Sequence, residues 1–185
     1  MEFSKLLEER RSIRDYESGV GISKEDVEKM IYAAQQAPSW KNSETGRYYV
    51  ALSKEGIERV RRALPDFNAE RTQNVVAYIV TSFKTKISGH NASGQPTDAN
   101  ADAWGAYDLG LQNENLLLKA RELGYDTLIM GLRDENELKA VFNIPEDEAI
   151  MAVIAVGKRK ATPAQAAKKR NKRDSEIYIK NKENA

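Results

Sequence analysis

The stretch Arg10-Arg11-Ser12-Ile13-Arg14-Asp15-Tyr16 places three guanidinium groups and one hydroxyl within five positions. It follows a predicted short helix over residues 2–10, in which Phe3, Leu6 and Leu7 recur at helical spacing. Guanidinium groups bind oxyanions through two-pronged, charge-assisted hydrogen bonds, and a serine hydroxyl can donate one more. The residues alone leave two interpretations open, a cradle for a phosphate group or a solvated, arginine-rich helix end.

The composition of the 185 residues narrows the class of protein. Lys and Arg number 29 against 28 Asp and Glu, and this net charge of +1 argues against a general nucleic-acid binder. The chain has no cysteine and a single histidine, so disulfides, thiolate catalysis and a histidine-built metal centre are not expected. The sequence contains neither an apolar signal core nor a run of about 18 apolar residues. We therefore expect one cytoplasmic domain without a membrane segment.

Hydrophobic periodicity predicts an α/β or α+β sandwich with helices on both faces of a sheet. Strands are expected at residues 48–52, 75–80, 125–130 and 149–156, the last of them central in the sheet. Helices are expected from the Ser23 N-cap to Pro38 and at residues 54–64, 101–123 and 134–142. The polar residues 84–100 are predicted to form a mobile loop or lid, in which His90 is exposed and takes no part in catalysis.

The longest predicted helix, residues 101–123, contains Gly105 and Gly110. Glycine inside a helix costs about 1 kcal/mol relative to alanine, so two of them suggest close approach of another helix or of a flat ligand. Trp104 and Tyr107 lie in the first turns of this helix, directly after the polar loop. Their rings are expected either to belong to the core or to stack on a substrate.

Nearly the whole chain resembles the nitroreductase family, flavoproteins in which an Arg-Arg-Ser-x-Arg-x-Tyr/Phe run holds flavin mononucleotide (FMN). Residues 37–44 resemble the family's Ala-Pro-Ser-x-x-Asn-x-Gln segment. Asn68 and Arg71 match an Asn-x-x-Lys/Arg element, and residues 123–132 match the glycine-containing element that follows the long helix. These motifs, in this order, carry the resemblance.

The resemblance implies a nitroreductase-like α/β sandwich, with a central, mostly antiparallel sheet flanked by helices in an interlocked homodimer. Residues 1–185 would form one FMN-binding domain, and the basic residues 158–185 would be a C-terminal extension that wraps the partner subunit. Its Ile177-Tyr178-Ile179 tip would bind there, and Arg170 or Arg173 would return to the flavin phosphate. The residues alone leave open a solvated tail or a weak polyanion-binding patch.

The resemblance also implies which residues contact FMN. Arg10, Arg11 and Ser12 would hold the phosphate, and Arg14 would lie at the N1 and O2 edge of the ring, where positive charge stabilises the reduced anion. The other contacts would come from three segments: Pro38, Ser39, Trp40 and Asn42 of the partner subunit, Asn68 and Arg71 at the ring edge and ribityl chain, and Met130 and Gly131, whose backbone N–H groups would face flavin N5.

Some of these positions also have an ordinary structural interpretation. Asn68 suits a helix N-cap after Phe67, and Gly131 suits a turn that ends a strand. Glu44 occupies the position of the family's usual Gln. Its carboxylate is expected either to change the charge preference of the substrate site or to pair with Arg47.

The function implied is an FMN-dependent oxidoreductase that transfers a hydride from NAD(P)H through flavin N5 to a small acceptor, such as a nitroaromatic or a quinone, in a ping-pong cycle. Glu44, Trp104 and Tyr107 would line the substrate side. Two alternatives are a flavin carrier without catalysis and a module that docks on polyanions through its basic tail. No metal, nucleic-acid or membrane partner is expected. The acceptor and the preference between NADH and NADPH are not determined by the sequence.

Overall fold

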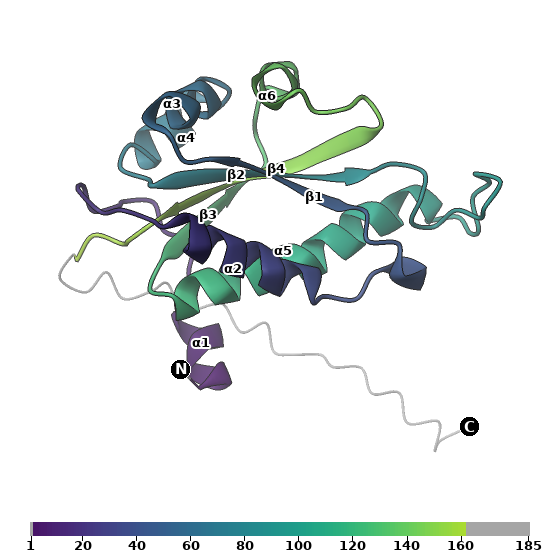
Figure 1. The fold of residues 1–185 in the computed structure, drawn as a ribbon, viewed down its shortest axis with the longest axis horizontal. Helices are drawn as coiled ribbons and strands as arrows, with labels where there is room; N and C mark the ends of the chain where they lie inside the picture. The colour runs from purple at the N-terminus through teal and green to yellow at the C-terminus, as the bar shows by residue number, and fades with distance from the viewer. Residues whose placement is uncertain (1, 162–185) are drawn as a thin grey trace, which may run out of the picture.

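The computed structural model describes residues 2–161, which contain one four-stranded antiparallel sheet (Figure 1). The strands are β1 (Gly46–Ala51), β2 (Ala77–Lys84), β3 (Asp126–Met130) and β4 (Glu148–Gly157), in the order β1-β2-β4-β3. Every predicted strand is present, and β4 lies inside the sheet as predicted. The α+β class is therefore confirmed.

Strand β2 continues beyond the predicted apolar run, past Val80 to Lys84. The hydroxyl of Thr81 donates to the Ala152 carbonyl at 3.4 Å, and the hydroxyl of Ser82 donates to the Glu148 carboxylate at 2.6 Å. Both serine and threonine side chains are fully buried. Because their hydroxyls are satisfied inside the sheet, polar residues continue the strand where hydrophobicity alone predicted its end.

Helices cover both faces of the sheet, as predicted (Figure 1). One face carries α2 (Lys24–Gln35) and α5 (Trp104–Glu122), with α1 (Phe3–Glu9) beside them. The other face carries α3 (Lys54–Arg62), α4 (Asp66–Arg71) and α6 (Glu135–Phe142). Two 3-10 turns, η1 (Trp40–Asn42) and η2 (Ala101–Ala103), complete the set. Within residues 2–161, no helix has the length and apolar character needed to cross a membrane.

The ends of the helices follow local sequence signals in most places. Ser23 caps α2 and Asp134 caps α6, each side chain accepting a hydrogen bond from the amide three residues on. Gly124 follows α5 with a φ of +88°, as expected of a C′ glycine. The predicted end of α2 at Pro38 was late, because the helix stops at Gln35.

The core has one apolar layer on each side of the sheet. Leu138 of α6 and Val60 of α3 belong to one layer, and Met30 of α2 and Leu116 of α5 belong to the other. Strands β2 and β4 contribute alternate residues to both layers, so their sequences are apolar almost throughout. Strands β2 and β4 are the inner strands of the sheet, and the elements of the candidate site are built around them.

The prediction of an exposed His90 was wrong, since the residue is only 7% exposed. Its Nδ1 lies 3.1 Å from the Ser88 carbonyl, and its Nε2 lies 3.5 Å from Asp102. Gly89, at a φ of +80°, presses so closely on Ala101 that a Cβ would stand 2.2 Å from its carbonyl oxygen. The first part of the polar loop therefore packs against η2, directly before α5, whereas residues 91–100 are exposed.

The two glycines of α5 have different surroundings. A Cβ on Gly105 would stand 2.3 Å from Phe83 Cδ2, so close approach is confirmed, but the neighbour is a side chain of β2. A Cβ on Gly110 would meet nothing within 4 Å among the described residues, so no helix of this chain approaches it closely, and approach of a ligand stays a prediction.

Candidate functional site

The arginine-rich stretch runs as extended backbone along the outer edge of β3. Ser12 forms a parallel bridge with Thr127, and the amide of Ile13 donates to the Thr127 carbonyl at 3.0 Å. Tyr16 is buried, and its hydroxyl donates to the Ile13 carbonyl at 2.9 Å. Helix α1 has already ended at Glu9. The stretch is therefore an ordered edge segment rather than a solvated helix end.

Two arginines of this segment carry buried donors without an acceptor. The Arg10 side chain is 17% exposed, and its Nε lies 3.4 Å from Glu114 Oε1 without forming a hydrogen bond. Within residues 2–161, the Nε atoms of Arg10 and Arg11 have no hydrogen-bond partner. Buried donors in proteins are nearly always paired. With the exposed Ser12 hydroxyl and the partly exposed guanidinium groups on either side of it, the residues present fit a phosphate group, which accepts charge-assisted hydrogen bonds.

Arg14 has a more open position. Its guanidinium is exposed, and Nη1 donates to the Ser12 carbonyl at 3.2 Å. The remaining donors of Arg14 can therefore reach a ligand bound next to Ser12.

A network of ion pairs supports the arginine-rich segment, residues 10–16. Asp126, buried at the start of β3, accepts hydrogen bonds from Arg121 at 3.1 Å and from the Arg159 Nε at 2.9 Å. Arg121 also pairs with Glu9 at 3.2 Å, directly before Arg10. The predicted site did not include these residues, and no local sequence signal could have found them, because they meet only in the folded chain.

Asn68 lies inside α4 and is buried, so the N-cap interpretation was wrong; Pro65 occupies the N-cap position. Arg71 is exposed, with its guanidinium carbon 5.4 Å from the centre of the Phe67 ring. Helix α4 follows Leu64, which belongs to the same apolar layer as Met130. The α3–α4 junction and the end of β3 therefore lie on the same side of the sheet.

The end of β3 leaves room for a ligand. The Met130 side chain is buried in the core, so that residue can offer only backbone groups. Gly131 is exposed, ends the strand, and has open space where a side chain would point. Arg133 donates to its carbonyl. Beside it lies a hollow of about 540 Å³, lined by Arg62, Ala63, Leu64, Pro65, Leu132, Arg133, Asp134 and Glu135.

The segment predicted to reach a partner subunit occupies a different place. The Trp40 amide donates to both carboxylate oxygens of Asp108 in α5, at 3.1 and 3.0 Å. The Glu44 carboxylate accepts a hydrogen bond from the Asn42 side-chain amide at 2.9 Å. Arg47 donates to the Glu44 carbonyl at 2.9 Å, so the predicted pairing of its guanidinium with the Glu44 carboxylate was wrong.

The two groups of predicted residues are separated along α5. Arg10 approaches Glu114, whereas Trp40 is bound to Asp108, six residues earlier. Six residues are roughly 9 Å along a helix axis and bring the side chain to another side of the helix. Figure 1 shows η1 near the first turns of α5 and α1 near its last turns. Within residues 2–161, no hydrogen bond or ion pair joins residues 10–14 to residues 38–44.

Trp104 and Tyr107 form an edge-to-face pair with ring centres 5.5 Å apart. The Trp104 indole donates to Asp98 at 3.2 Å. Tyr107 is 60% exposed, so the core interpretation was wrong for this ring. The pair lies on the same stretch of α5 as Asp108, close to the segment that contains Trp40.

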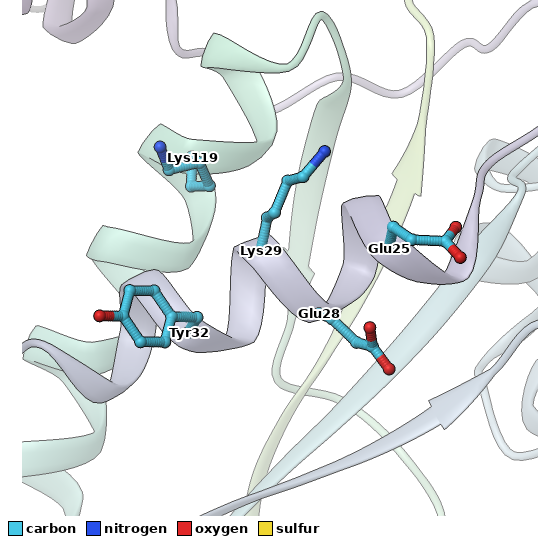
Figure 2. A pocket seen from close by; sticks show the side chains of 5 residues that line it. All are labelled: Glu25, Glu28, Lys29, Tyr32 and Lys119. Atoms are coloured by element: carbon cyan, nitrogen blue, oxygen red, sulfur yellow. The ribbon is translucent and has the colours of Figure 1, made fainter.

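A second hollow lies away from the predicted site residues. A hollow of about 370 Å³ is lined by Glu25, Glu28, Lys29, Tyr32 and Lys119, none of which was predicted to bind a ligand. Figure 2 shows these side chains on α2 and α5. Arg170, Arg173 and the Ile177-Tyr178-Ile179 tip lie outside the described residues. Among residues 2–161 there is no cluster of His, Asp or Glu that could hold a metal ion.

Comparisons with known proteins assign the fold to a family. The nitroreductase family model matches residues 7–158. The chain is 31% identical over 157 residues to an Archaeoglobus fulgidus protein named "Putative NADH dehydrogenase/NAD(P)H nitroreductase", with 83% of each chain covered. It superposes on a nitroreductase family protein from Clostridium novyi with a TM-score of 0.73, 25% identity and 86% of each chain covered.

A second solved structure contains a flavin. It is an FMN complex of a protein from Exiguobacterium sibiricum, with a TM-score of 0.76 and 25% identity, and the match covers 89% of this chain and 92% of that one. The order of strands and helices, the arginine-rich edge segment and these matches agree with one another. The chain belongs to the nitroreductase family.

Proposed function

We propose that this protein is an FMN-dependent oxidoreductase that takes a hydride from NAD(P)H and passes it to a small acceptor such as a nitroaromatic or a quinone. The observation that carries the proposal is the arginine-rich edge segment beside β3, in which Arg10 and Arg11, adjacent in sequence to Ser12, have buried Nε atoms without a hydrogen-bond partner among residues 2–161. In a nitroreductase chain whose relatives include FMN complexes, a flavin phosphate is the anion that suits them.

The residues of one subunit would bind and orient the flavin. Arg10, Arg11 and Ser12 would hold the phosphate through charge-assisted hydrogen bonds. Arg14 would place positive charge at the pyrimidine edge of the ring, where reduction adds negative charge. The backbone N–H groups near Gly131 would donate to the flavin ring, because no described residue fills the space where a Gly131 side chain would point. FMN itself supplies the hydride chemistry when bound.

A homodimer would complete the site. Residues 38–44 are held near Asp108, away from residues 10–14 of the same chain, so both segments would line one flavin if the first came from a partner subunit. Large apolar side chains stand exposed on α1 and on the outer side of α5, namely Phe3, Leu7, Tyr107 and Leu111. Burying such surfaces is what an obligate interface requires. That Arg170 or Arg173 reaches the flavin phosphate stays a prediction.

The acceptor side would be formed by exposed groups near the start of α5. Tyr107 and Trp104 offer aromatic surface, and the Glu44 carboxylate adds a negative charge held by Asn42. An acceptor that is flat and neutral or cationic suits this surface better than an anionic one.

The test begins with the absorption spectrum of the purified protein. A yellow protein that bleaches with NADH or NADPH under anaerobic conditions, and recovers with a quinone, supports the proposal. Arg10→Ala should weaken FMN binding roughly 10- to 150-fold through lost charge-assisted bonds, and Ser12→Ala should weaken it less. Arg59→Ala, on the exposed surface of α3, is the control and should bind normally.

Four results would contradict the proposal or a part of it. A colourless protein that does not bind added FMN is not a flavoenzyme, and a yellow protein that no reduced nicotinamide bleaches is a carrier. Full retention of FMN by both Arg10→Ala and Ser12→Ala would remove the phosphate assignment. Sedimentation that shows a folded, flavin-loaded monomer at micromolar concentration would contradict a flavin site shared by two subunits.

A further inference from the structure

The carboxylate of Asp108 is buried in α5, where the residue is only 2% exposed. Both its oxygens accept from the Trp40 amide, at 3.1 and 3.0 Å, and Oδ2 also accepts from the Ser88 hydroxyl at 2.7 Å. These donors are neutral, and within residues 2–161 no basic side chain forms an ion pair with Asp108. Buried carboxylates are rare unless they are paired with a cation or fully hydrogen-bonded. Asp108 therefore has a specific structural task.

The hydrogen-bond directions around Asp108 follow from its chemistry. The Ser88 hydroxyl donates its single proton to Asp108 Oδ2. Ser88 Oγ lies 2.7 Å from Ser43 Oγ, and this second bond must run from Ser43 to Ser88. Thr45 Oγ1 is a further neighbour of Ser88 at 3.4 Å. One carboxylate thus orders hydroxyl groups from two loops.

The segment attached to this network has a strained backbone. Lys41, Asn42 and Glu44 have φ values of 47°, 55° and 49°, in the left-handed region that residues with side chains seldom adopt. Within the segment, the Ser39 hydroxyl accepts from the Glu44 amide at 3.0 Å. Such strain persists only where surrounding contacts enforce it, and it is frequent at ligand-binding sites. The Asp108 carboxylate is the contact that enforces it from α5.

We propose that Asp108 is a positioning residue, which holds residues 39–44 in the conformation that forms the partner-side wall of the flavin pocket. This inference rests on the proposed function, because it assigns that wall to the segment. Asp108 acts through Trp40 and, by way of Ser88, through Ser43. It does not itself touch the flavin or the acceptor.

The test compares Asp108→Asn with Asp147→Asn, a control on an exposed aspartate that pairs with Lys84 on the surface. Asparagine keeps the size of the side chain but replaces one acceptor oxygen with a donor group, so the Trp40 amide loses part of its bond. Hydrogen exchange of the Trp40 and Ser43 amides should then become at least tenfold faster in FMN-free Asp108→Asn. Exchange in α6, which is remote from the network, should stay unchanged.

The second measurement uses the flavin-loaded dimer. In Asp108→Asn, the dissociation constant of FMN and the KM for a quinone acceptor should each rise about tenfold, while kcat changes less. Ser88→Ala removes the other hydroxyl link and should shift the same quantities in the same direction. It also serves if Asp108→Asn does not fold.

The outcomes separate this inference from the proposed function. A wild-type protein that neither binds FMN nor is bleached by NADH or NADPH refutes the proposed function. It also refutes the proposal that residues 39–44 form a wall of the flavin pocket. A normal wild type with unchanged loop exchange in both variants refutes only the anchoring by Asp108. Faster loop exchange with unchanged FMN affinity and KM would show that residues 39–44 do not form the pocket, which also overturns the inference.

Discussion

Replacing Asp126 by asparagine tests whether the arginine-rich segment depends on the buried ion-pair network behind it. The Asp126 side chain is only 2% exposed and accepts from Arg121 Nη1 at 3.1 Å, from the Arg159 amide and Nε at 2.9 Å each, and from Arg159 Nη2. The carboxylate raises the pKa of the Arg159 guanidinium above its ordinary value, chiefly through these hydrogen bonds. An amide at this position would turn a donor group toward one of the two arginines.

The size of the effect follows from the exposure of the partners. Removing one member of a fully buried ion pair costs about 3–5 kcal/mol. The Arg121 and Arg159 side chains are 20% and 39% exposed, and both keep a bond to Glu9, so water and Glu9 replace part of the loss. We therefore expect Asp126→Asn to lower the free energy of unfolding by about 2–3 kcal/mol. In a chain of this length, the melting temperature would fall by roughly 5–10 °C.

The assay is urea unfolding of the FMN-free protein, followed by circular dichroism at one fixed protein concentration, with Asp147→Asn as the surface control. FMN affinity should fall as well, because Asp126 directly precedes Thr127, which holds Ser12. A change in the free energy of unfolding below about 0.5 kcal/mol, equal to that of the control, would refute the argument that this network supports the segment.

Three further predictions concern single side chains. Arg14→Gln should bind FMN with modest loss but lower its midpoint potential, by about 30 mV if the charge supplies ~1.4 kcal/mol; an unchanged potential in a spectroelectrochemical titration would place Arg14 away from the ring. Glu44→Gln should improve the use of anionic over neutral quinones by up to about fivefold in KM, and an unchanged ratio would place Glu44 outside the acceptor site. Burial and then the neighbouring Glu148 raise the pKa of Tyr49 from 10.0 to about 12, so the neutral phenol is favoured in the folded state. This stabilisation is complete below pH 10 and is lost as the pH rises through 12, so Tyr49→Phe should flatten the alkaline decline of the urea midpoint.

Much of the fold was predictable from local sequence. The caps at Ser23 and Asp134, the glycine after α5 and the apolar runs of the central strands all act between residues close in the chain. Backbone preferences and hydrophobic periodicity are local, so they predict where helices and strands form without knowledge of their partners. The order of the motifs was likewise sufficient to recognise the family.

Tertiary structure decided what local sequence does not encode, namely which buried polar groups meet. Thr81 and Ser82 continue β2 because their acceptors lie on a neighbouring strand, and Asn68 is buried within α4 rather than placed at its start. Asp108 receives the Trp40 amide from 68 residues away, and Asp126 receives Arg159 from 33 residues away. A buried charge is tolerated only where packing brings its donors, and packing depends on the whole chain. For the same reason, the distance in space between residues 10–14 and residues 38–44 could be known only from the folded chain.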